Sequence, residues 1–543
     1  MNVIISGAWV YANGSLHIGH VASLISGDVI ARYYRQKGDD VCYVSGSDCY
    51  GTPITIKAKK EGKSPLKIAE FYHKEFVDCF NALGFSYDYY GKTISNEHNE
   101  FVKDFHRKLY ESKSVIEKKV QQAYCVDCEE YLPDRFVEGK CPECGEITRG
   151  DQCDACGRVL EPELLIEGRC ALCGQKIGFK ESTHLYLRLS DYEADLRKLV
   201  DESSYWRKNA IDFTNRYLDE GLRDKALTRD LKWGIEVPKE GYSDKKIYIW
   251  AENVLGYLSS SSVATRKNQD FNDYWKNEEA LHYYVHGKDN IPFHTIILPS
   301  LLLANGENYH LPDRIISSEY LTLEHKKIST SKDYAVWIKD IINRYDPDTI
   351  RYFLIANGPE KRDTDFSFRE LINRHNGELL GTYGNFINRT IVFIEKYFNN
   401  KIPDGSIDEN IEAQLKSIYK TTGENIEIGN LRAGLEEIFN LLRSANKYFD
   451  TNKPWETRTT DIKECENTIY NCIQIIANTA VLLEPFIPFS SNKVIKWLGI
   501  NDTWDFKLIE SGISINSIDK LFERIDKKII HEELEKLNIK DIN

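Results

Sequence analysis

The sequence predicts an α/β fold in which a parallel sheet, split by a cysteine-rich insertion, is followed by an α-helical bundle. Three observations support this prediction. The apolar run Asn2–Ser6 ends at a glycine and is followed by an Asn-Gly turn and by helical spacing of apolar residues over Leu16–Tyr34. A second run, Val41–Asp48, leads into a glycine turn and indicates another strand. From Glu370 onward, apolar residues recur with a period near 3.6, which indicates long helices packed on one another.

The remaining elements follow in chain order. After the insertion, Lys246–Trp250 and His282–Asp289 are predicted to continue the parallel sheet. A helix is predicted to start at Asp346–Thr349, with Asp346 or Asp348 as its cap. The bundle helices are predicted over Leu371–Phe398, Ile411–Thr422, Leu431–Phe449 and Glu464–Leu483, with linkers near Asn399–Ile407 and Thr451–Thr460.

Composition limits the class of protein. A chain of 543 residues is long enough for several domains, and 41% hydrophobic with 29% charged residues is typical of a globular protein. The net charge of −13 argues against indiscriminate nucleic-acid binding, but it does not exclude a local basic groove for one folded RNA. The longest apolar stretch, Thr295–Ala304, is too short to cross a bilayer, and the start of the chain lacks the basic flank of a signal peptide. We therefore expect a cytoplasmic protein without a membrane segment.

The turn before the first predicted helix carries two histidines at its start. The segment reads Tyr-Ala-Asn-Gly-Ser-Leu-His-Ile-Gly-His, from Tyr11 to His20. A helix N-terminus offers free N–H groups to a phosphate, and His17 and His20, three residues apart, share one face of the first turn. Gly19 leaves room for a flat nucleobase beside the backbone. The alternative is two surface histidines on an ordinary amphipathic helix, but the strand–turn–helix context favours a phosphate site.

Eight of the 13 cysteines form four Cys-x-x-Cys pairs. The pairs are Cys125/Cys128, Cys141/Cys144, Cys153/Cys156 and Cys170/Cys173. Glycine follows Cys144, Cys156 and Cys173, as in zinc-knuckle turns, and four thiolates make a closed, structural site. We expect two zinc ions, one site from the two inner pairs and one from the two outer pairs. A single zinc site and a disulfide framework are the alternatives, and the latter does not suit reducing surroundings.

These motifs together resemble a known family. The Tyr11–His20 segment is similar to the HIGH region of class I aminoacyl-tRNA synthetases, and its Tyr-Ala-Asn-Gly start is most similar to the methionyl-tRNA synthetases. The resemblance runs along nearly the whole chain. It implies a Rossmann-like parallel-sheet catalytic domain, split by a zinc-knuckle connective insertion and followed by a C-terminal α-helical bundle. It also implies ATP-dependent ligation of methionine to tRNA through methionyl-adenylate, with release of AMP and diphosphate, and magnesium bound with ATP.

A second motif lies some three hundred residues later. Lys326–Lys332, which reads Lys-Lys-Ile-Ser-Thr-Ser-Lys, resembles the KMSKS loop, with Thr330 at the position of its second lysine. A mobile loop with ammonium groups can neutralise departing pyrophosphate. We expect Lys327 to keep this role and Lys332, or Lys326, to supply the missing charge. The alternative is an ordinary solvated loop.

The resemblance and the chemistry of the side chains assign further residues. A carboxylate at the carboxyl end of a parallel strand lines the ligand crevice, so Asp48 is expected to hold the substrate ammonium group, with an Asx turn as the alternative. The expected methionine pocket consists of Trp9, Tyr11, Asp48, Trp250, Asn253, Val254, Tyr257 and His294. The expected ATP site consists of Asn13, Gly14, His17, Gly19, His20, Lys327, Ser329 and Thr330. Aromatic rings suit a thioether, although each could be an ordinary core residue.

The bundle is expected to bind the anticodon of methionine-accepting tRNAs, both elongator and initiator. Asn385 and Arg389 share a helical face, and Pro454-Trp455 lies at a helix junction, where the tryptophan offers a stacking surface. The alternative for Trp455 is a core or rim position. Phe522–Asp526 resembles a tail that returns to the catalytic domain, and without an appended oligomerising domain we expect a monomer.

The expected domain boundaries follow from these assignments. They are 1–117 and 233–322 for the two catalytic halves, 118–232 for the insertion, 323–370 for the KMSKS-like region, 371–515 for the bundle and 516–543 for the tail. Three other functions remain as alternatives: a class I synthetase for another apolar amino acid, a plain nucleotidyltransferase, and a non-catalytic zinc-dependent RNA-binding protein.

Overall fold

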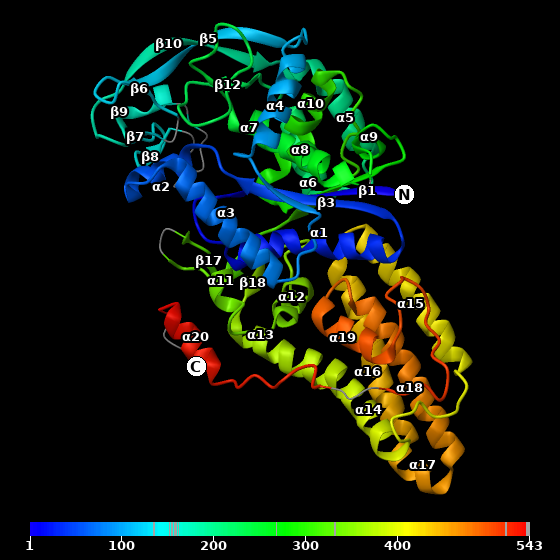
Figure 1. Cartoon of the computed structure of the whole chain (residues 1–543). Helices are drawn as coiled ribbons and strands as arrows, with labels where there is room; N and C mark the ends of the chain where they lie inside the picture. Colours follow the sequence, from blue (N-terminus) through cyan, green and yellow to red (C-terminus); the bar gives the residue numbers. More distant parts are fainter. Residues whose placement is uncertain are drawn as a thin grey trace.

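The computed structural model describes residues 1–133, 136–150, 153, 156, 160, 162–267, 269–330, 333–515 and 519–538. An α/β body carries the cysteine-rich insertion on one side, and a bundle of long helices extends away from the body on the other (Figure 1). After the bundle the chain crosses back toward α13 (Phe368–Arg374), and its last described helix, α20 (Ile529–Lys536), lies beside α13 (Figure 1).

A parallel sheet forms the centre of the body. Its strands are β1 (Asn2–Gly7), β2 (Val10–Tyr11), β3 (Asp40–Asp48), β4 (Tyr89–Lys92), β14 (Leu281–Gly287) and β15 (Arg314–Ser318). The order is β15-β14-β1-β3-β2, with β4 also paired to β3, and every pairing is parallel. The strands predicted over Asn2–Ser6, Val41–Asp48 and His282–Asp289 are therefore confirmed.

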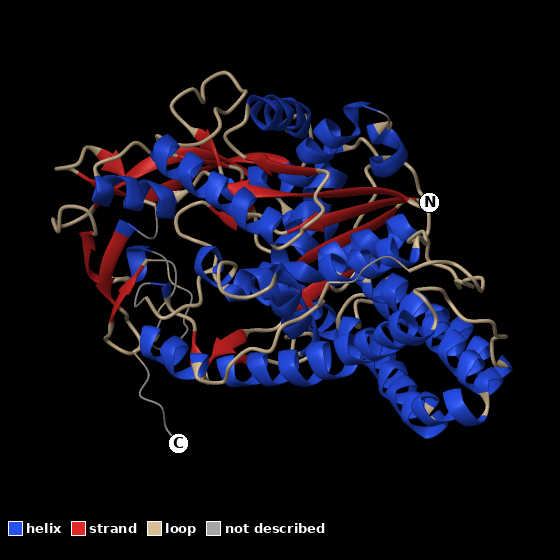
Figure 2. Ribbon diagram, turned by 60° about the horizontal axis from the view of Figure 1, so that its bottom comes forward, coloured by secondary structure: helices blue, strands red, loops and turns tan. Residues whose placement is uncertain are grey.

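Helices cover both faces of this sheet, as its continuous apolar strands require (Figure 2). Val3 and Ile5 belong to the apolar core shared with α1, whereas Ile4 belongs to a second core on the opposite face. The helices of the body are α1 (Ile18–Gln36), α2 (Thr52–Glu61), α3 (Pro65–Ala82), α4 (Asn96–Leu109), α5 (Glu193–Glu202), α6 (Lys208–Asp219), α7 (Ile249–Glu252), α8 (Gly256–Ala264), α9 (Phe271–Trp275) and α10 (Leu298–Asn305).

The insertion is built on two long antiparallel strands, β5 (Val115–Cys125) and β10 (Gly178–Leu187). Its cysteine-rich tip holds a three-stranded sheet of β7 (Val137–Lys140), β8 (Ile147–Arg149) and β9 (Ile166–Cys170). The short strands β6 (Glu130–Tyr131) and β11 (Lys225–Ala226) extend the β5–β10 sheet at its two edges.

The prediction that Lys246–Trp250 continues the parallel sheet is wrong. Only Lys246–Ile247 form a strand, β13, which pairs antiparallel with β12 (Thr228–Arg229) in a separate sheet. At Ile249 the chain enters α7. The side chains of Ile247 and Ile249 are buried in the second core and not in the parallel sheet. A short apolar run fits a buried strand and a buried helical turn equally well, which is why periodicity alone misled.

The segment after β15 forms a small sheet and two helices. The sheet contains β16 (Leu321–Leu323), β17 (Lys326–Lys327) and β18 (Thr364–Phe366). The helices are α11 (Ile338–Ile341) and α12 (Pro347–Ala356). Asp346 caps α12, because its carboxylate accepts from the N–H of Asp348 at 2.9 Å, while the buried Asp348 accepts from Ser490 instead.

The bundle contains α13, a π-helical segment over His375–Gly384, α14 (Asn385–Tyr397), α15 (Glu409–Glu427), α16 (Leu431–Asn452), α17 (Pro454–Thr460), α18 (Ile462–Leu483) and α19 (Pro488–Leu498). The linker near Asn399–Ile407 is confirmed. The linker over Thr451–Thr460 is mostly wrong, because Pro454 starts α17, the position of a helix at which proline is favourable.

The C-terminal tail follows the bundle back to the body and ends in α20 (Ile529–Lys536). The backbone carbonyl of Glu523 accepts from the His375 ring, and Asn376 exchanges hydrogen bonds with the backbone of Ile525. The buried carboxylate of Glu533 pairs with Arg344, at the loop between α11 and α12. These contacts place the tail against the segment that follows β17.

Candidate functional site

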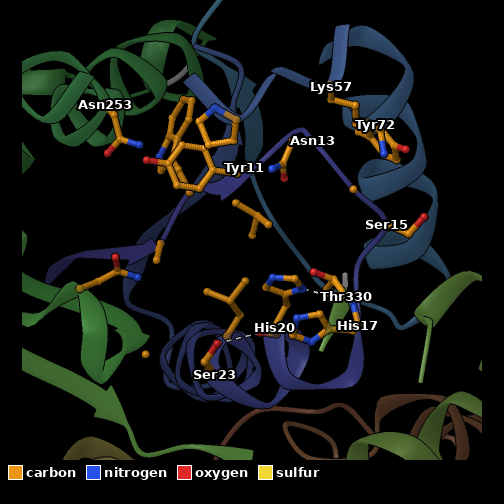
Figure 3. A pocket seen from close by; sticks show the side chains of 18 of the residues that line it. Tyr11, Asn13, Ser15, His17, His20, Ser23, Lys57, Tyr72, Asn253 and Thr330 are labelled. Atoms are coloured by element: carbon orange, nitrogen blue, oxygen red, sulfur yellow. Dashed lines mark hydrogen bonds between the residues drawn. The ribbon is translucent and has the colours of Figure 1, made fainter. Parts of the chain in front are cut away.

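A cavity of about 900 Å³ opens at the carboxyl end of the central strands, where ligands bind in sheets of this type. Its lining starts in the residues that follow β1 and includes the first turn of α1 and parts of α2, α3, α7 and α8 (Figure 3). Twelve of the predicted site residues line it: Trp9, Tyr11, Asn13, Gly14, His17, His20, Trp250, Asn253, Val254, Tyr257, His294 and Thr330. Gly19, Asp48, Lys327 and Ser329 do not belong to its lining.

His17 and His20 form the cap of α1. Their rings stack with centroids 3.7 Å apart. The Nδ1 atom of His17 accepts from the N–H of Gly19 at 3.2 Å, and the Nδ1 atom of His20 accepts from the N–H of His17 at 3.1 Å. In each neutral ring the proton is therefore on Nε2, which none of the described residues accepts from.

Burial keeps both rings neutral. It lowers the pKa of His17 to about 4, and it lowers the pKa of His20 well below its usual value, with a further contribution from His17. Two neutral imidazoles thus present N–H donors to the cavity, an arrangement suited to phosphate oxygens that gain charge.

The two motifs that lie about three hundred residues apart in sequence meet at this point. The N–H of Ile18 donates to the carbonyl of Val336, and the N–H of Ile338 donates to the carbonyl of Leu16, both at 2.9 Å. A Cβ placed on Gly19 would lie 3.4 Å from a methyl carbon of Ile328. The convergence on which a shared triphosphate site depends is therefore present.

The KMSKS-like loop reaches the cavity through Thr330. Ser329 and Tyr334 exchange backbone hydrogen bonds at 2.9 Å, which turns the loop back on itself. Lys326 and Lys327 form β17 and are exposed. Lys332 lies outside the described residues, so the structure leaves its expected role untested.

One end of the cavity is aromatic. Tyr11 meets the Trp250 ring edge-on at 6.2 Å, and Trp250 stacks on Phe293 at 3.9 Å. Tyr257 donates to Nε2 of His294 at 2.7 Å, because Nδ1 of that ring donates to the carbonyl of Asn290. The result is an apolar wall with one fixed hydroxyl–imidazole pair.

Trp9 occupies a slot made by glycines. A Cβ on Gly256 would lie 2.5 Å from the Trp9 ring, and one on Gly46 would lie 2.6 Å from it. No other residue type could stand at these two positions without displacing the ring. The backbone therefore fixes how far Trp9 reaches into the cavity.

Asp48 lies behind the cavity wall. Its carboxylate is fully buried and accepts from the side-chain amide of Asn253 at 2.6 Å and from the N–H of Tyr50 at 3.2 Å. Burial and the neighbouring carboxyl of Glu252 raise the pKa of Asp48 well above its usual value. The Tyr50 contact is the Asx turn weighed as an alternative, and Asn253, not Asp48, faces the cavity.

Sequence reasoning missed a group of lysines. Lys57 and Lys60 of α2 and Lys339 of α11 line the cavity near Tyr72 of α3. A helical pattern over Pro53, Ile56, Lys57 and Lys60 could have indicated a shared face, but nothing in the sequence shows that this face meets the histidines.

The cysteines form two groups of four, as predicted. Cys125, Cys128, Cys170 and Cys173 make one group and Cys141, Cys144, Cys153 and Cys156 the other, with the sulfur atoms of each group within 4.8 Å of one another. Two Sγ–Sγ distances in each group lie between 3.5 and 4.0 Å. A tetrahedral zinc site with Zn–S bonds of about 2.3 Å requires sulfurs about 3.8 Å apart, so both groups fit zinc.

The knuckle turns have the expected backbone. Gly145 and Gly174 adopt φ values of +75° and +74°, and their N–H groups donate to the carbonyls of Cys141 and Cys170. Glycine at these two positions lets the chain turn tightly around each Cys-x-x-Cys pair, as a closed site of four thiolates requires.

The residues expected to read the anticodon lie together on the bundle. Arg389 pairs with Asp450 at 2.6 Å and lies over the Phe449 ring, and that ring is 6.2 Å from the ring of Trp455. Asn385 contacts Asn446, while Pro454 is buried at the start of α17. Trp455 is 43% exposed, so an apolar ring is open to a partner at this end of the bundle.

Within the described part of the chain, every helix is too short or too polar to span a membrane.

Two family profiles match the chain. The profile described as "tRNA synthetases class I (M)" matches residues 3–391, and "Anticodon binding domain of methionyl tRNA ligase" matches residues 402–539.

Curated relatives are similar over their full length. "Methionine--tRNA ligase 1" of Alkaliphilus oremlandii is 54% identical over 99% of this chain and 100% of its own. "Methionine--tRNA ligase" of Bacillus cereus (strain 03BB102) is 52% identical over 99% of both chains. Among solved structures, Mycobacterium tuberculosis methionyl-tRNA synthetase bound by methionyl-adenylate shares the fold, with a TM-score of 0.81, 22% identity, and coverage of 96% of this chain and 100% of that one.

Proposed function

The chain belongs to the methionyl-tRNA synthetases of class I, and from this premise we propose that it joins L-methionine to its tRNA in two steps. In the first step the methionine carboxylate attacks the α-phosphorus of ATP, the bond to the β-phosphate breaks, and methionyl-adenylate and pyrophosphate form. In the second, a hydroxyl of the terminal ribose of the tRNA attacks the acyl carbon and AMP leaves.

The observation that carries the proposal is the meeting of three features at one cavity. The paired histidines of α1, the threonine of the KMSKS-like loop and the aromatic wall line the same 900 Å³ space. The backbone pairing between Leu16–Ile18 and Val336–Ile338 holds the first two together. A nucleotidyltransferase with another acceptor would have no use for the aromatic end.

The histidines act on the triphosphate. The Nε2–H groups of His17 and His20 donate to phosphate oxygens as negative charge develops on them, and a donor already fixed in place needs no reorganisation. Lys327 and Lys332 of the loop are expected to approach the leaving pyrophosphate. Asn13, Gly14, Gly19, Ser329 and Thr330 are expected to hold the rest of the nucleotide.

The aromatic end is proposed to take the methionine side chain. A thioether is polarizable and packs well on ring edges and faces, which suits the wall of Trp9, Tyr11, Trp250 and Tyr257. The amide of Asn253 gives its N–H to Asp48, so its oxygen is left to accept from the substrate ammonium group. Asp48 thus orients the amine through Asn253.

Zinc and magnesium have different parts in this proposal. Zinc in the two cysteine groups would hold the tip of the insertion in shape, as a closed site of four thiolates does. Magnesium would accompany ATP and neutralise its phosphate charge. Among the described residues that line the cavity, Asp333 is the one with a carboxylate. This carboxylate accepts a hydrogen bond from the indole N–H of Trp337.

The bundle is proposed to bind the anticodon of elongator and initiator methionine tRNAs. Asn385 and Arg389 can hydrogen-bond the edges of unstacked bases, and Trp455 can stack on them. We further propose that the protein acts as a monomer in the cytoplasm.

The test is amino-acid-dependent ATP–pyrophosphate exchange, measured across all twenty amino acids on a sample whose metal content is determined. Exchange with methionine is expected, together with zinc in the sample. Exchange that responds to another apolar amino acid would assign the chain to a sister synthetase. If none of the twenty amino acids supports exchange, the chain would instead be interpreted as a non-catalytic zinc-dependent RNA-binding protein.

A further inference from the structure

The cavity contains a second group of polar residues that the proposed roles do not use. Lys57 and Lys60 lie on one face of α2 with Pro53 and Ile56, and this face lines the cavity. Lys339 belongs to α11 and lines the same cavity. We call Lys57, Lys60 and Lys339 the lysine rim.

The rim is joined to the catalytic motifs by the backbone. Lys339 directly follows Ile338, whose N–H donates to the carbonyl of Leu16, one residue before His17. Its ammonium group lies 3.6 Å from the carboxylate of Glu75. The backbone hydrogen bond between Ile338 and Leu16 therefore places the backbone of Lys339 close to that of His17.

The two α2 lysines are only weakly engaged. Lys57 lies over the Tyr72 ring at 4.8 Å and 3.7 Å from Glu61, one turn along the same helix (Figure 3 labels Lys57 and Tyr72). Lys60 has neither an ion pair nor a hydrogen bond with any residue that the structure describes. Ammonium groups facing a cavity without strong partners are ready to take an anion.

The lysine rim supplies the positive charge of the described cavity lining. The paired histidines are neutral and Thr330 stands where the family's loop has a lysine, while Lys327 is absent from the lining. Among the described lining residues, the side chains with a full positive charge are therefore the three of the rim. Pyrophosphate gains negative charge as it leaves, so cations must lie near it.

We propose that the lysine rim binds the pyrophosphate end of ATP and compensates for the lysine that the KMSKS-like loop lacks at Thr330. The inference rests on the proposed function, because it names the phosphate subsite of that same cavity. It adds to the loop lysines a cationic wall that does not have to move into place.

The structure supplies a matched control on the same helix. Lys59 lies between the rim lysines in sequence but faces away, lining a separate groove under the insertion and pairing with Glu130 at 3.6 Å. Lys59→Met removes the same charge from the same helix without changing the cavity. The test compares Lys57→Met/Lys60→Met, Lys339→Met and Lys59→Met with the unaltered chain.

Two measurements separate this proposal from the proposed function. Calorimetry with inorganic pyrophosphate and with ATP reads binding without turnover, and each rim lysine removed is expected to weaken pyrophosphate binding about tenfold, as for a lost charge-assisted contact. In methionine-dependent exchange, KM for pyrophosphate is expected to rise while KM for methionine stays constant. Thr330→Lys in the Lys339→Met background is expected to restore part of the pyrophosphate affinity.

Rim variants that bind pyrophosphate as tightly as Lys59→Met would overturn the proposal, even if the unaltered protein exchanges with methionine. A loss confined to acyl transfer, with pyrophosphate binding and exchange unchanged, would also overturn it and assign the lysines to the tRNA end. If the unaltered protein binds pyrophosphate through the rim but exchanges with no amino acid, the proposed function fails and the subsite stands.

Discussion

The guanidinium of Arg351 lies 2.7 Å from the carboxylate of Asp28, and both side chains are fully buried. Arg351 also donates to the carbonyls of Leu83, Pro485 and Phe486. Asp28 belongs to α1, whose first turn carries the paired histidines, while Pro485 and Phe486 follow α18 of the bundle. One ion pair therefore ties the helix of the catalytic site to the bundle.

Asp28→Asn should lower the free energy of unfolding by about 3–5 kcal/mol, because it leaves Arg351 buried without its partner charge. Burial alone would raise the pKa of Asp28, but Arg351 and Arg32 outweigh it and bring the pKa to about 2. The folded pKa is below the unfolded value near 3.8, so the pair's contribution is complete above pH 4 and is lost as pH falls toward 2. Urea unfolding across this pH range measures both effects.

Asp104→Asn is the control for this prediction. Asp104 and Arg107 form an exposed pair on α4, and such pairs contribute about 0–1 kcal/mol. Equal losses in the Asp28→Asn and Asp104→Asn variants would show that the buried pair does not stabilise the junction.

Removing either histidine should slow adenylate formation. His17→Asn or His20→Asn takes away one N–H donor and is expected to reduce kcat of exchange about 10²–10³-fold. Because burial holds the His17 pKa at about 4, protonation of this ring should affect the rate near pH 4 and not near 6.5. His325→Asn, at an exposed turn, should change neither the rate nor the profile. An inflection near pH 6.5 that disappears in His17→Asn would contradict the assignment.

The position of Trp9 should control the fit of methionine. Gly256→Ala would place a methyl group 2.5 Å from the Trp9 ring and displace the ring from its position in the cavity wall. KM for methionine in the exchange reaction is expected to rise about 10- to 100-fold, the usual consequence of a displacement near 1 Å, with KM for ATP little changed. Gly377→Ala is the control, because an added Cβ there meets no atom within 4 Å. An unchanged KM for methionine would mean that Trp9 does not shape the pocket.

The two cysteine groups should bind zinc independently. The protein as purified is expected to contain two zinc ions, and Cys144→Ser and Cys173→Ser should each lose one, because the four sulfurs of each group form a separate site. Metal analysis by mass spectrometry measures this, and thermal unfolding should show destabilisation of the insertion. Cys79→Ala, a buried cysteine away from both groups, should keep both ions. Loss of both ions from one variant would contradict two separate sites.

Features that depend on residues close together in the chain could be predicted from the sequence, whereas contacts between elements far apart in the chain could not. The strand and capped helix around His17 follow from residues adjacent in the chain, and the knuckles follow from the spacing of Cys141 and Cys144, so both were predictable. The lysine rim was not, because nothing local shows that Lys57 and Lys339 face one cavity. The burial of Asp48 behind Asn253 was missed for the same reason: which side chain ends at the surface depends on packing between elements.

The exposed aromatic end of the bundle yields the last prediction. Trp455→Ala removes a surface on which a base can stack, and Arg389→Ala removes a guanidinium that lies over Phe449 beside it. Each is expected to lower kcat/KM for aminoacylation about 10- to 100-fold through KM for tRNA, since stacking on one ring contributes about 1–3 kcal/mol. Methionine-dependent exchange should be unchanged, because it requires no tRNA. Arg443→Ala, a paired arginine on α16, controls for general loss of charge on the bundle. A matching loss in that variant, or a fall in exchange, would place the effect in folding and not in anticodon recognition.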